Sequence, residues 1–253
     1  MEFPVETGEI PGFDTDVLVV GGGLVGQSLA IALAQAGVSV HVVDRAVPET
    51  TLAPEHDGRA SAISFASQQM LRAIGVWNDI AESQPILGIR VTDRNSPLHI
   101  HFDHKGLGGE PFGAMVENRH MRLGLHTTLK RTTVRNTAPE SLKSFVTNPF
   151  GVEATLESGD VVHARMLVAA DGARSQTRDM AGIGTRGWSY DQWGIVTTVA
   201  HERPHEGIAH ERFLNPGPFA ILPLTGNRSS LVWTEAPAMA AEMVKLGDER
   251  FGE

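Results

Sequence analysis

Residues 15–44 constrain the fold of this chain more than any other stretch does. An apolar run ends at Gly21, and a helical pattern follows it. Gly37 stands where a helix C-cap glycine belongs, and a β-branched run then ends in Asp44. This order of segments predicts a strand, a tight turn, a helix and a second strand, which together form a βαβ unit.

The turn of this unit carries Gly21, Gly23 and Gly26 in a G-x-G-x-x-G pattern. The first glycine permits a sharp turn, the second lets backbone N–H groups approach a pyrophosphate, and the third lets the helix lie close to the strand. Asp44 follows Gly26 at close to the spacing of about 20 residues that is expected for a carboxylate that binds a ribose. The pattern therefore indicates a dinucleotide site at the helix N-terminus. A glycine-rich turn without a ligand is the alternative, but the strand, the helix, the capping glycine and the acidic residue together disfavour it.

The totals narrow the class of protein. The 253 residues are 41% hydrophobic and 20% charged, as in ordinary globular proteins of one or two domains. A net charge of −9 argues against binding to nucleic acid, whose phosphates select basic surfaces. The absence of cysteine excludes disulfides and thiolate sites. No run is long enough for a membrane span and no signal peptide is visible, so we expect a cytoplasmic protein.

Further helices and strands follow from the hydrophobic periodicity. We expect helices at 61–74, at 118–131 with Asn118 as the cap, and at 238–246. We expect a hairpin of 152–156 with 161–168, and strands at 86–92, 98–102, 194–199, 210–214, 219–224 and 230–234. This order favours a nucleotide-binding domain that is interrupted and then followed by a mostly antiparallel domain.

Two further stretches combine charge with unusual backbone. Arg59 comes directly before the expected helix at 61–74, where it could bind a phosphate while Ser61 caps the helix. Asp171 and Gly172 follow an apolar strand directly. Ligands of open α/β sheets bind beyond the carboxyl ends of strands, so this segment predicts a second part of one site. Each of these stretches could also be an ordinary surface turn.

The motifs, taken in order, resemble those of a known family. The glycine pattern with its distal aspartate, then DGRASAIS, ENRHMRLGL and AADGARS, resembles the motif series of the FAD-dependent aromatic hydroxylases, which are similar to 4-hydroxybenzoate hydroxylase. Within that superfamily, GIAHERFLNPGPFAILPLTGNRSSLVWTE resembles the polyprenylphenol hydroxylases of ubiquinone biosynthesis. The resemblance covers residues 15–235.

The resemblance implies an α/β fold: a Rossmann-like FAD-binding βαβ domain with an interleaved, mostly antiparallel β substrate domain. It implies a monooxygenase in which NAD(P)H reduces the FAD and O2 forms a flavin C4a-hydroperoxide that hydroxylates a polyprenylated phenol. Other proteins of ubiquinone biosynthesis are implied partners, and so is peripheral contact with a membrane. The cofactor carries the hard chemistry, and the protein positions the ring and excludes water.

The resemblance also assigns residues. The implied FAD-binding set is Gly21, Gly23, Gly26, Asp44, Arg45, Arg59, Arg122, Asp171 and Gly172. Phe219 and Leu222 are implied to line the substrate pocket. No residue takes a clear acid or base role, although one histidine of His201, His205 and His210 could assist phenol deprotonation. We expect no metal site, since His99 and His101 alone supply too few ligands, and we expect Trp188 and Trp193 to pack in a core.

The family carries a further Gly-Asp motif downstream that nothing after Glu235 resembles, so we expect a C-terminally truncated chain. The expected domains are a flexible leader at 1–14, the FAD-binding domain at 15–82 and 112–186, and an incomplete substrate domain at 83–111 and 187–253. Two alternatives stay open: a catalytically inactive FAD-binding or scaffolding fragment, and an NAD-dependent dehydrogenase. The dehydrogenase accounts for the βαβ unit but not for DGR or AADGARS.

Overall fold

A computed structural model describes residues 12–53, 56–247 and 250. It divides the chain into two compact units, and each unit is built from two separate segments. Unit 1 contains residues 1–52 and 125–185, and unit 2 contains 53–124 and 186–253. Most of the expected leader, residues 1–11, lies outside the described part of the chain.

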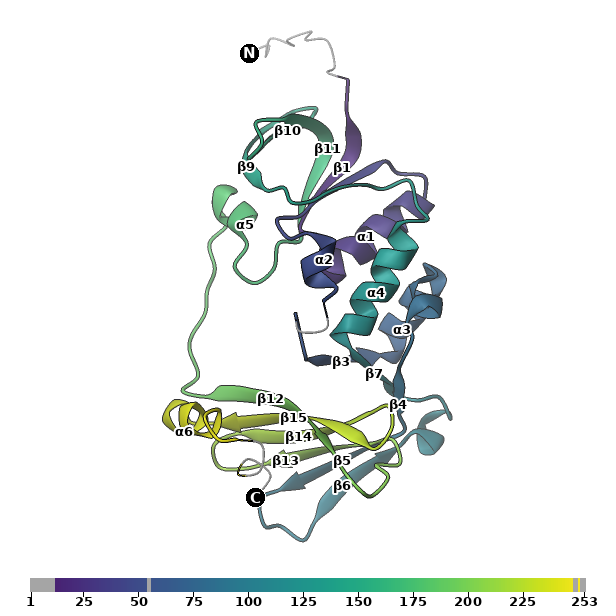
Figure 1. Ribbon diagram of the computed structural model, residues 1–253, viewed down its shortest axis with the longest axis vertical. Coiled ribbons are helices and arrows are strands. Elements are labelled where there is room, and N and C mark those ends of the chain that lie inside the picture. Colours follow the sequence, from purple (N-terminus) through teal and green to yellow (C-terminus); the bar gives the residue numbers. More distant parts are fainter. Residues whose placement is uncertain (1–11, 54–55, 248–249, 251–253) are drawn as a thin grey trace, which may run out of the picture. The chain divides into compact units, whose positions relative to one another are not determined.

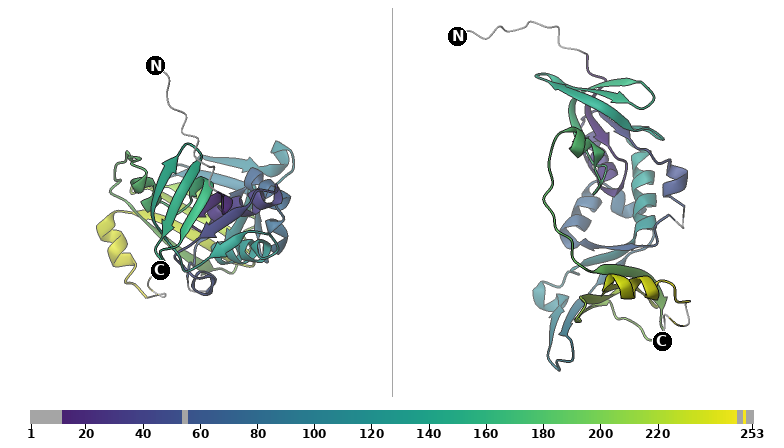
Figure 2. Two further views of the ribbon diagram at one scale, coloured as in Figure 1. Left: turned by 90° about the horizontal axis from the view of Figure 1, so that it is seen from above. Right: turned by 90° about the vertical axis from the view of Figure 1, so that its left-hand side faces the viewer.

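Unit 1 is built on a six-stranded sheet with the order β8-β2-β1-β11-β10-β9 (Figure 1). Its strands are β1 (Thr15–Val20), β2 (Val40–Val43), β8 (Arg135–Thr137), β9 (Leu142–Asn148), β10 (Gly151–Leu156) and β11 (Val161–Ala169). The pairs β8-β2, β2-β1 and β1-β11 are parallel, whereas β11-β10 and β10-β9 are antiparallel. The antiparallel strands, teal to green in Figure 2, extend the sheet beyond β11. The expected βαβ unit and the expected hairpin are both present.

The two central parallel strands, β1 and β2, form because their residues are mostly apolar and buried. β2 is buried along its whole length, as parallel strands usually are. Helix α1 (Leu24–Gln35) packs on β1 and β2 and buries Ala30 and Ile31. Full burial of a residue such as Ile31 contributes about 1.5–3 kcal/mol. Short helices α2 (Pro48–Thr51) and α5 (Gln176–Met180) complete the unit.

Unit 2 holds a second six-stranded sheet with the order β12-β15-β14-β13-β5-β6. Its strands are β5 (Gly88–Asp93), β6 (His99–Asp103), β12 (Trp193–Ala200), β13 (Ile208–Phe213), β14 (Pro218–Leu224) and β15 (Arg228–Glu235). Only the β13-β5 pair is parallel. Helix α6 (Pro237–Met243) packs on β12 and β15 (Figure 2).

A three-stranded antiparallel sheet, β3-β7-β4, belongs to the same unit. Its strands are β3 (Ala60–Ser64), β4 (Gln84–Ile86) and β7 (Gly113–Glu117), and α3 (Phe65–Ala73) packs on it. Ile86 and Met115 of this sheet form one buried cluster with Ala209 and Leu224 of the larger sheet. This cluster joins the two sheets of unit 2. Helix α4 (Asn118–Leu129) begins directly after β7 and crosses the boundary between the units at residue 125.

Two expected elements are wrong in detail. The expected helix at 61–74 begins as strand β3, and α3 starts only at Phe65, because β3 pairs with the distant β7 over its whole length. The helix is capped by Ser64, whose hydroxyl accepts a hydrogen bond from the N–H of Ser67, and not by Ser61. The expected strand at 86–92 is two strands, since β4 pairs in the small sheet and β5 in the large one.

The units divide the chain at 52/53, 124/125 and 185/186, whereas the sequence places domain boundaries at 82/83, 111/112 and 186/187. The functional division into FAD-binding and substrate domains stays a prediction. Of the helices in the described residues, none has the length and apolar character needed to cross a bilayer.

Candidate functional site

The turn between β1 and α1 depends on two of its glycines for packing. Gly21 has a φ of +106°, and a Cβ there would lie 2.4 Å from the carbonyl oxygen of Ala170. A Cβ on Gly26 would lie 1.9 Å from the carbonyl oxygen of Gly21. Only glycine at both positions lets α1 and β11 approach the turn this closely.

The middle glycine of the pattern, Gly23, differs from the other two because a side chain there would not contact any neighbouring atom at its Cβ. A Cβ on Gly23 would have no atom within 4 Å. Gly23 is the N-cap of α1, and it offers no side-chain cap, while the first turn of the helix carries no acidic residue. No side chain of the described residues therefore caps the first N–H groups of this 12-residue helix, which lie at the positive end of its dipole. This geometry fits the pyrophosphate of a dinucleotide cofactor.

Asp44 closes the turn from the end of β2. Its carboxylate accepts hydrogen bonds from the backbone N–H of Gly22 and, at 2.7 Å, from that of Ala46. Carboxylate oxygens have further lone pairs, so Asp44 can still accept a bond from a ribose hydroxyl. Arg45, the next residue, is exposed.

Asp171 and Gly172 follow the end of β11, which lies beside β1. The Asp171 carboxylate accepts hydrogen bonds from the N–H of Thr177 at 3.1 Å and from its hydroxyl at 3.0 Å. Burial alone would raise the pKa of Asp171, but hydrogen bonds from Ser175 and Thr177 outweigh it and lower the pKa. Gly172 has a φ of +88°. The segment therefore holds an ionised carboxylate in a fixed turn before α5.

The unit 1 residues expected in the site thus converge. The carboxyl ends of β1, β2 and β11 are neighbours in one parallel arrangement, and they bring the glycine turn, Asp44 and Asp171 to the same edge of the sheet. This edge is where open α/β sheets bind ligands.

In unit 2, the carboxylate of Asp57 binds both arginines that the resemblance assigns to FAD binding, Arg59 and Arg122. Arg59 donates to its carboxylate through Nε at 2.8 Å and Nη2 at 3.0 Å, and Arg122 donates through Nη2 at 2.7 Å. Asn118 donates its amide N–H at 3.0 Å. The hydrogen bonds from Arg59 contribute most to lowering the pKa of Asp57 well below its usual range, followed by those from Arg122 and Asn118, against the effect of burial.

The sequence did not predict this role for Asp57. The only signal was its place two residues before Arg59 in DGR. The expected role of Asn118 as a helix cap is also wrong: it is the first residue of α4, and its side chain is bonded to Asp57 and to the hydroxyl of Ser61 at 2.6 Å.

A cavity of about 510 Å³ opens beside this network within unit 2. Its volume falls in the range of small-molecule sites. Its walls are Asp57, Gly58, Arg59, Glu117, Arg119, Val196, Thr197, Thr198 and Arg228. The charged groups come from the DGR loop, β7, α4 and β15, whereas the valine and threonines come from β12.

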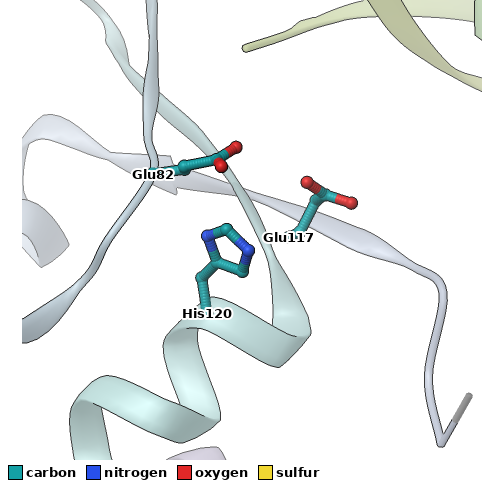
Figure 3. A group of neighbouring side chains, drawn as sticks. All are labelled: Glu82, Glu117 and His120. Atoms are coloured by element: carbon teal, nitrogen blue, oxygen red, sulfur yellow. The ribbon is translucent and has the colours of Figure 1, made fainter. Parts of the chain in front are cut away.

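Figure 3 shows Glu82, Glu117 and His120 converging, and Glu117 also lines this cavity. One ligand atom from each residue lies within 4.8 Å of the others, which is close enough for the three residues to bind a metal ion. However, Nη2 of Arg228 lies 3.1 Å from Glu117 and 3.7 Å from Glu82, and Arg119 lies 3.3 Å from Glu117. Burial would raise the pKa of Glu117, but these two arginines keep it low. The guanidinium of Arg228 thus provides the positive charge that a metal would bring.

The two residues expected in the substrate pocket lie on opposite faces of β14. Phe219 stacks edge-on against Trp233 with 5.2 Å between ring centroids. Leu222 packs against the buried cluster around Met115. They are three residues apart, and successive side chains of a strand alternate between faces. A pocket over one face of this sheet can therefore contain only one of them.

The two tryptophans expected in a core and the three histidines considered for phenol deprotonation all lie in unit 2. Trp188 and Trp193 are 78% and 56% exposed, so the expectation that they pack in a core is wrong. His201 and His205 bond to backbone carbonyls in the loop before β13, whereas His210 lies on the strand itself. Only His210 of the three projects from the sheet.

Comparison with known proteins finds a similarity to FAD-binding proteins and to hydroxylases of ubiquinone biosynthesis. A family profile described as "FAD binding domain" matches residues 14–243. Ubiquinone hydroxylase UbiL of Rhodospirillum rubrum is 50% identical over 98% of this chain and 59% of its own length. The 3-demethoxyubiquinol 3-hydroxylase of Escherichia coli is 35% identical over 92% and 60%. Human ubiquinone biosynthesis monooxygenase COQ6 is 33% identical over 93% and 54%. The chain thus spans little more than half the length of these relatives.

Solved structures agree in fold. PqsL of Pseudomonas aeruginosa superposes with a TM-score of 0.77 at 20% identity, covering 90% of this chain and 63% of PqsL. The p-nitrophenol 4-monooxygenase PnpA of Pseudomonas putida gives 0.75 at 20% identity, covering 91% and 61%. These likenesses confirm the expected combination of a Rossmann-like domain with a β domain.

Proposed function

Since the chain belongs to the family of FAD-binding domains, its cofactor is FAD, and we propose that the protein hydroxylates a polyprenylated phenol of ubiquinone biosynthesis with NAD(P)H and O2. The observation that carries the proposal is the 50% identity to a ubiquinone hydroxylase over 98% of this chain. An NAD-dependent dehydrogenase would not account for the match to an FAD-binding family.

We assign the cofactor contacts from the geometry of each unit and from the family resemblance. The N–H groups at the start of α1, open beside Gly23, would hold the pyrophosphate, and Asp44 would accept bonds from the adenosine ribose. Arg45, Asp171 and Gly172 complete the proposed set in unit 1. Arg59 and Arg122, both oriented by Asp57, are the proposed contacts in unit 2.

Bound FAD, once reduced by NAD(P)H, supplies the oxygen transfer. The residues of the chain bind and orient the cofactor and the ring and keep water away. We further propose contact with other proteins of ubiquinone biosynthesis and peripheral contact with a membrane, because the expected substrate carries a long apolar tail.

The test begins with the visible spectrum of the purified chain with and without added FAD, and with mass identification of any released cofactor. Oxidation of NAD(P)H and formation of a hydroxylated product are then measured with a short-chain prenylphenol. Gly23→Val is the variant that tests the site, because its side chain fills the space beside α1 while its Cβ meets no neighbouring atom. We expect a flavin spectrum and prenylphenol-dependent turnover that Gly23→Val abolishes. A chain that ignores FAD, or that binds NAD instead, contradicts the proposal.

A further inference from the structure

One outer edge of the large sheet of unit 2 is a short strand that is open along its whole length. Strand β6 comes last in the strand order and pairs only with β5 among the described strands (Figure 1). All five of its residues are exposed, including Ile100 at 59% and Phe102 at 44%. Proteins commonly guard such an edge with lysine or proline, and β6 contains neither. The edge is therefore able to pair with another strand.

The register with β5 shows which backbone groups of β6 lie at this edge. Opposite residues of an antiparallel pair alternate between those that bond each other and those whose backbone groups point away. The N–H of His104, directly after β6, donates to the carbonyl of Leu87, directly before β5, so the alternation starts from a bonded pair. It then directs the N–H and C=O groups of His99, His101 and Asp103 away from β5, towards the free edge.

The sequence of β6, HIHFD, is complementary to itself when two copies run antiparallel. A two-fold axis through His101, the middle residue, places Ile100 of each copy opposite Phe102 of the other. The same register places His99 of each copy opposite Asp103 of the other, so an imidazole N–H faces a carboxylate. Aromatic residues opposite β-branched residues, and basic residues opposite acidic ones, are pairs that stabilise antiparallel strands. Pairing would thus cover part of both exposed apolar side chains.

The backbone and the side chain at the axis agree with this register. The residues that face one another across the axis, His99, His101 and Asp103, are those whose N–H and C=O groups point to the free edge. The ring of His101 leans over β5, where a Cβ on Gly88 would lie 3.1 Å from its Cε1. The ring therefore leaves the edge open to a second strand.

Neighbouring registers are less favourable. A two-fold axis through Ile100 would place His99 opposite His101, and an axis through Phe102 would place His99 opposite Lys105. Both arrangements set basic side chains against each other, which destabilises a strand pair. Each would also pair only three residues of β6 with their counterparts, whereas the axis through the middle residue pairs all five.

We propose that β6 is a dimer interface, at which two copies of this chain join their large sheets edge to edge about a two-fold axis through His101. Such a contact uses the same surface on both copies, so it closes on itself and gives a dimer. One strand pair of this length is small against the roughly 1,200 Å² of a stable interface. The dimer therefore exchanges with the monomer and forms as the concentration rises. The inference does not depend on the proposed activity.

The first test is a thiol cross-link, which is specific because the chain contains no cysteine. Residues that bond each other across antiparallel strands have Cα atoms about 5.5 Å apart, within the range of about 4.4–6.8 Å that a disulfide spans. We expect His101→Cys to form a covalent dimer under mild oxidation of the native chain. His99→Cys is the matched control on the same strand, because its two copies would lie about 13 Å apart in this register and should not cross-link.

Sedimentation equilibrium from about 1 μM to about 1 mM measures the association of the unmodified chain. We expect the mass to approach that of a dimer at the upper end of this range. Ile100→Lys should raise the dissociation constant at least about tenfold, because it places a charge opposite Phe102. Val146→Lys makes the same kind of change at a 66% exposed position on β9, the edge strand of unit 1, and should leave the association unchanged.

Three results would overturn the inference: a wild-type chain that stays monomeric, cross-linking of His99→Cys as readily as of His101→Cys, or wild-type association in the folded Ile100→Lys variant. Loss of association in Val146→Lys would assign the dimer to β9 instead. A monomeric chain that binds phosphatidylglycerol vesicles, and loses them in Ile100→Lys, would assign the edge to a membrane surface. Either of these outcomes also contradicts the β6 dimer. Circular dichroism checks the fold of each variant.

Discussion

At the scale of single residues, Asp57 holds together the two arginines of the candidate site in unit 2. Its carboxylate, 6% exposed, bonds Arg59 and the mostly buried Arg122. We expect Asp57→Asn to destabilise the fold by about 1–3 kcal/mol, because it leaves a partly buried guanidinium without its counter-charge. It should also weaken FAD binding. Urea unfolding and FAD titration measure the two effects.

The control for this prediction is Asp179→Asn. Asp179 is 69% exposed and pairs with Arg178 at 3.3 Å. Exposed pairs contribute little, so this variant should change the unfolding free energy by less than about 1 kcal/mol. Equal losses in the two variants would show that Asp57 has no special role.

His41 predicts a pH dependence of stability. It is 2% exposed on β2 and lies 2.9 Å from the hydroxyl of Thr137. Burial, followed by the charge of Arg135, lowers its pKa from 6.5 to about 4. As the pH falls from 6.5 towards 4 the unfolded chain takes up the proton and the folded chain does not, so stability is lost over this window.

The contribution of His41 to this loss should reach about 3 kcal/mol. Urea unfolding at several pH values from 7.5 to 4.5 measures it. His41→Gln should flatten that part of the profile, whereas His56→Gln, at an exposed position, should leave it unchanged. A profile that His41→Gln does not alter would contradict the assignment.

At the scale of elements, the turn between β1 and α1 separates a packing glycine from a binding glycine. Gly26→Ala would place its Cβ 1.9 Å from a carbonyl oxygen, so α1 must move, and we expect a loss of about 3 kcal/mol or more. Gly23→Ala meets no atom within 4 Å and should keep stability within about 0.5 kcal/mol.

The same two variants should differ in how they affect FAD. Gly23→Ala should weaken binding at least about tenfold, because its methyl group occupies the space beside the N–H groups of α1. Thermal unfolding with and without FAD measures stability and affinity together. If Gly23→Ala kept wild-type affinity, the pyrophosphate would have to bind elsewhere.

How far the elements could be predicted depends on where their partners lie in the sequence. The βαβ unit was predicted because its turn, helix and strands are specified locally by Gly21, Gly26 and Gly37. Strand β3 was missed because only its pairing with the distant β7 selects strand over helix for ASAIS. The opposite directions of Phe219 and Leu222 were readable from their spacing. The ion pairs of Arg228 with Glu82 and Glu117 were not, since these residues lie far apart in the sequence, before β4, at the end of β7 and at the start of β15.

At the scale of the whole molecule, the two units have separate hydrophobic cores, and different spectroscopic signals follow their unfolding. Unit 1 buries a cluster around Leu18 and Val43, and unit 2 one around Met115 and Leu224. All four tryptophans, Trp77, Trp188, Trp193 and Trp233, belong to unit 2. Tryptophan fluorescence therefore follows the unfolding of unit 2, whereas far-ultraviolet circular dichroism follows both units.

We expect two core variants to move these signals separately. Gly26→Ala weakens unit 1, so it should shift part of the dichroism curve to lower urea and leave the fluorescence midpoint in place. Leu224→Ala, at a side chain 2% exposed, should shift the fluorescence midpoint by a loss of about 2–5 kcal/mol and leave the unit 1 phase unchanged. Chains with more than one core commonly depart from two-state unfolding. If each variant shifted both curves by the same amount, the chain would unfold as one cooperative body despite its two cores.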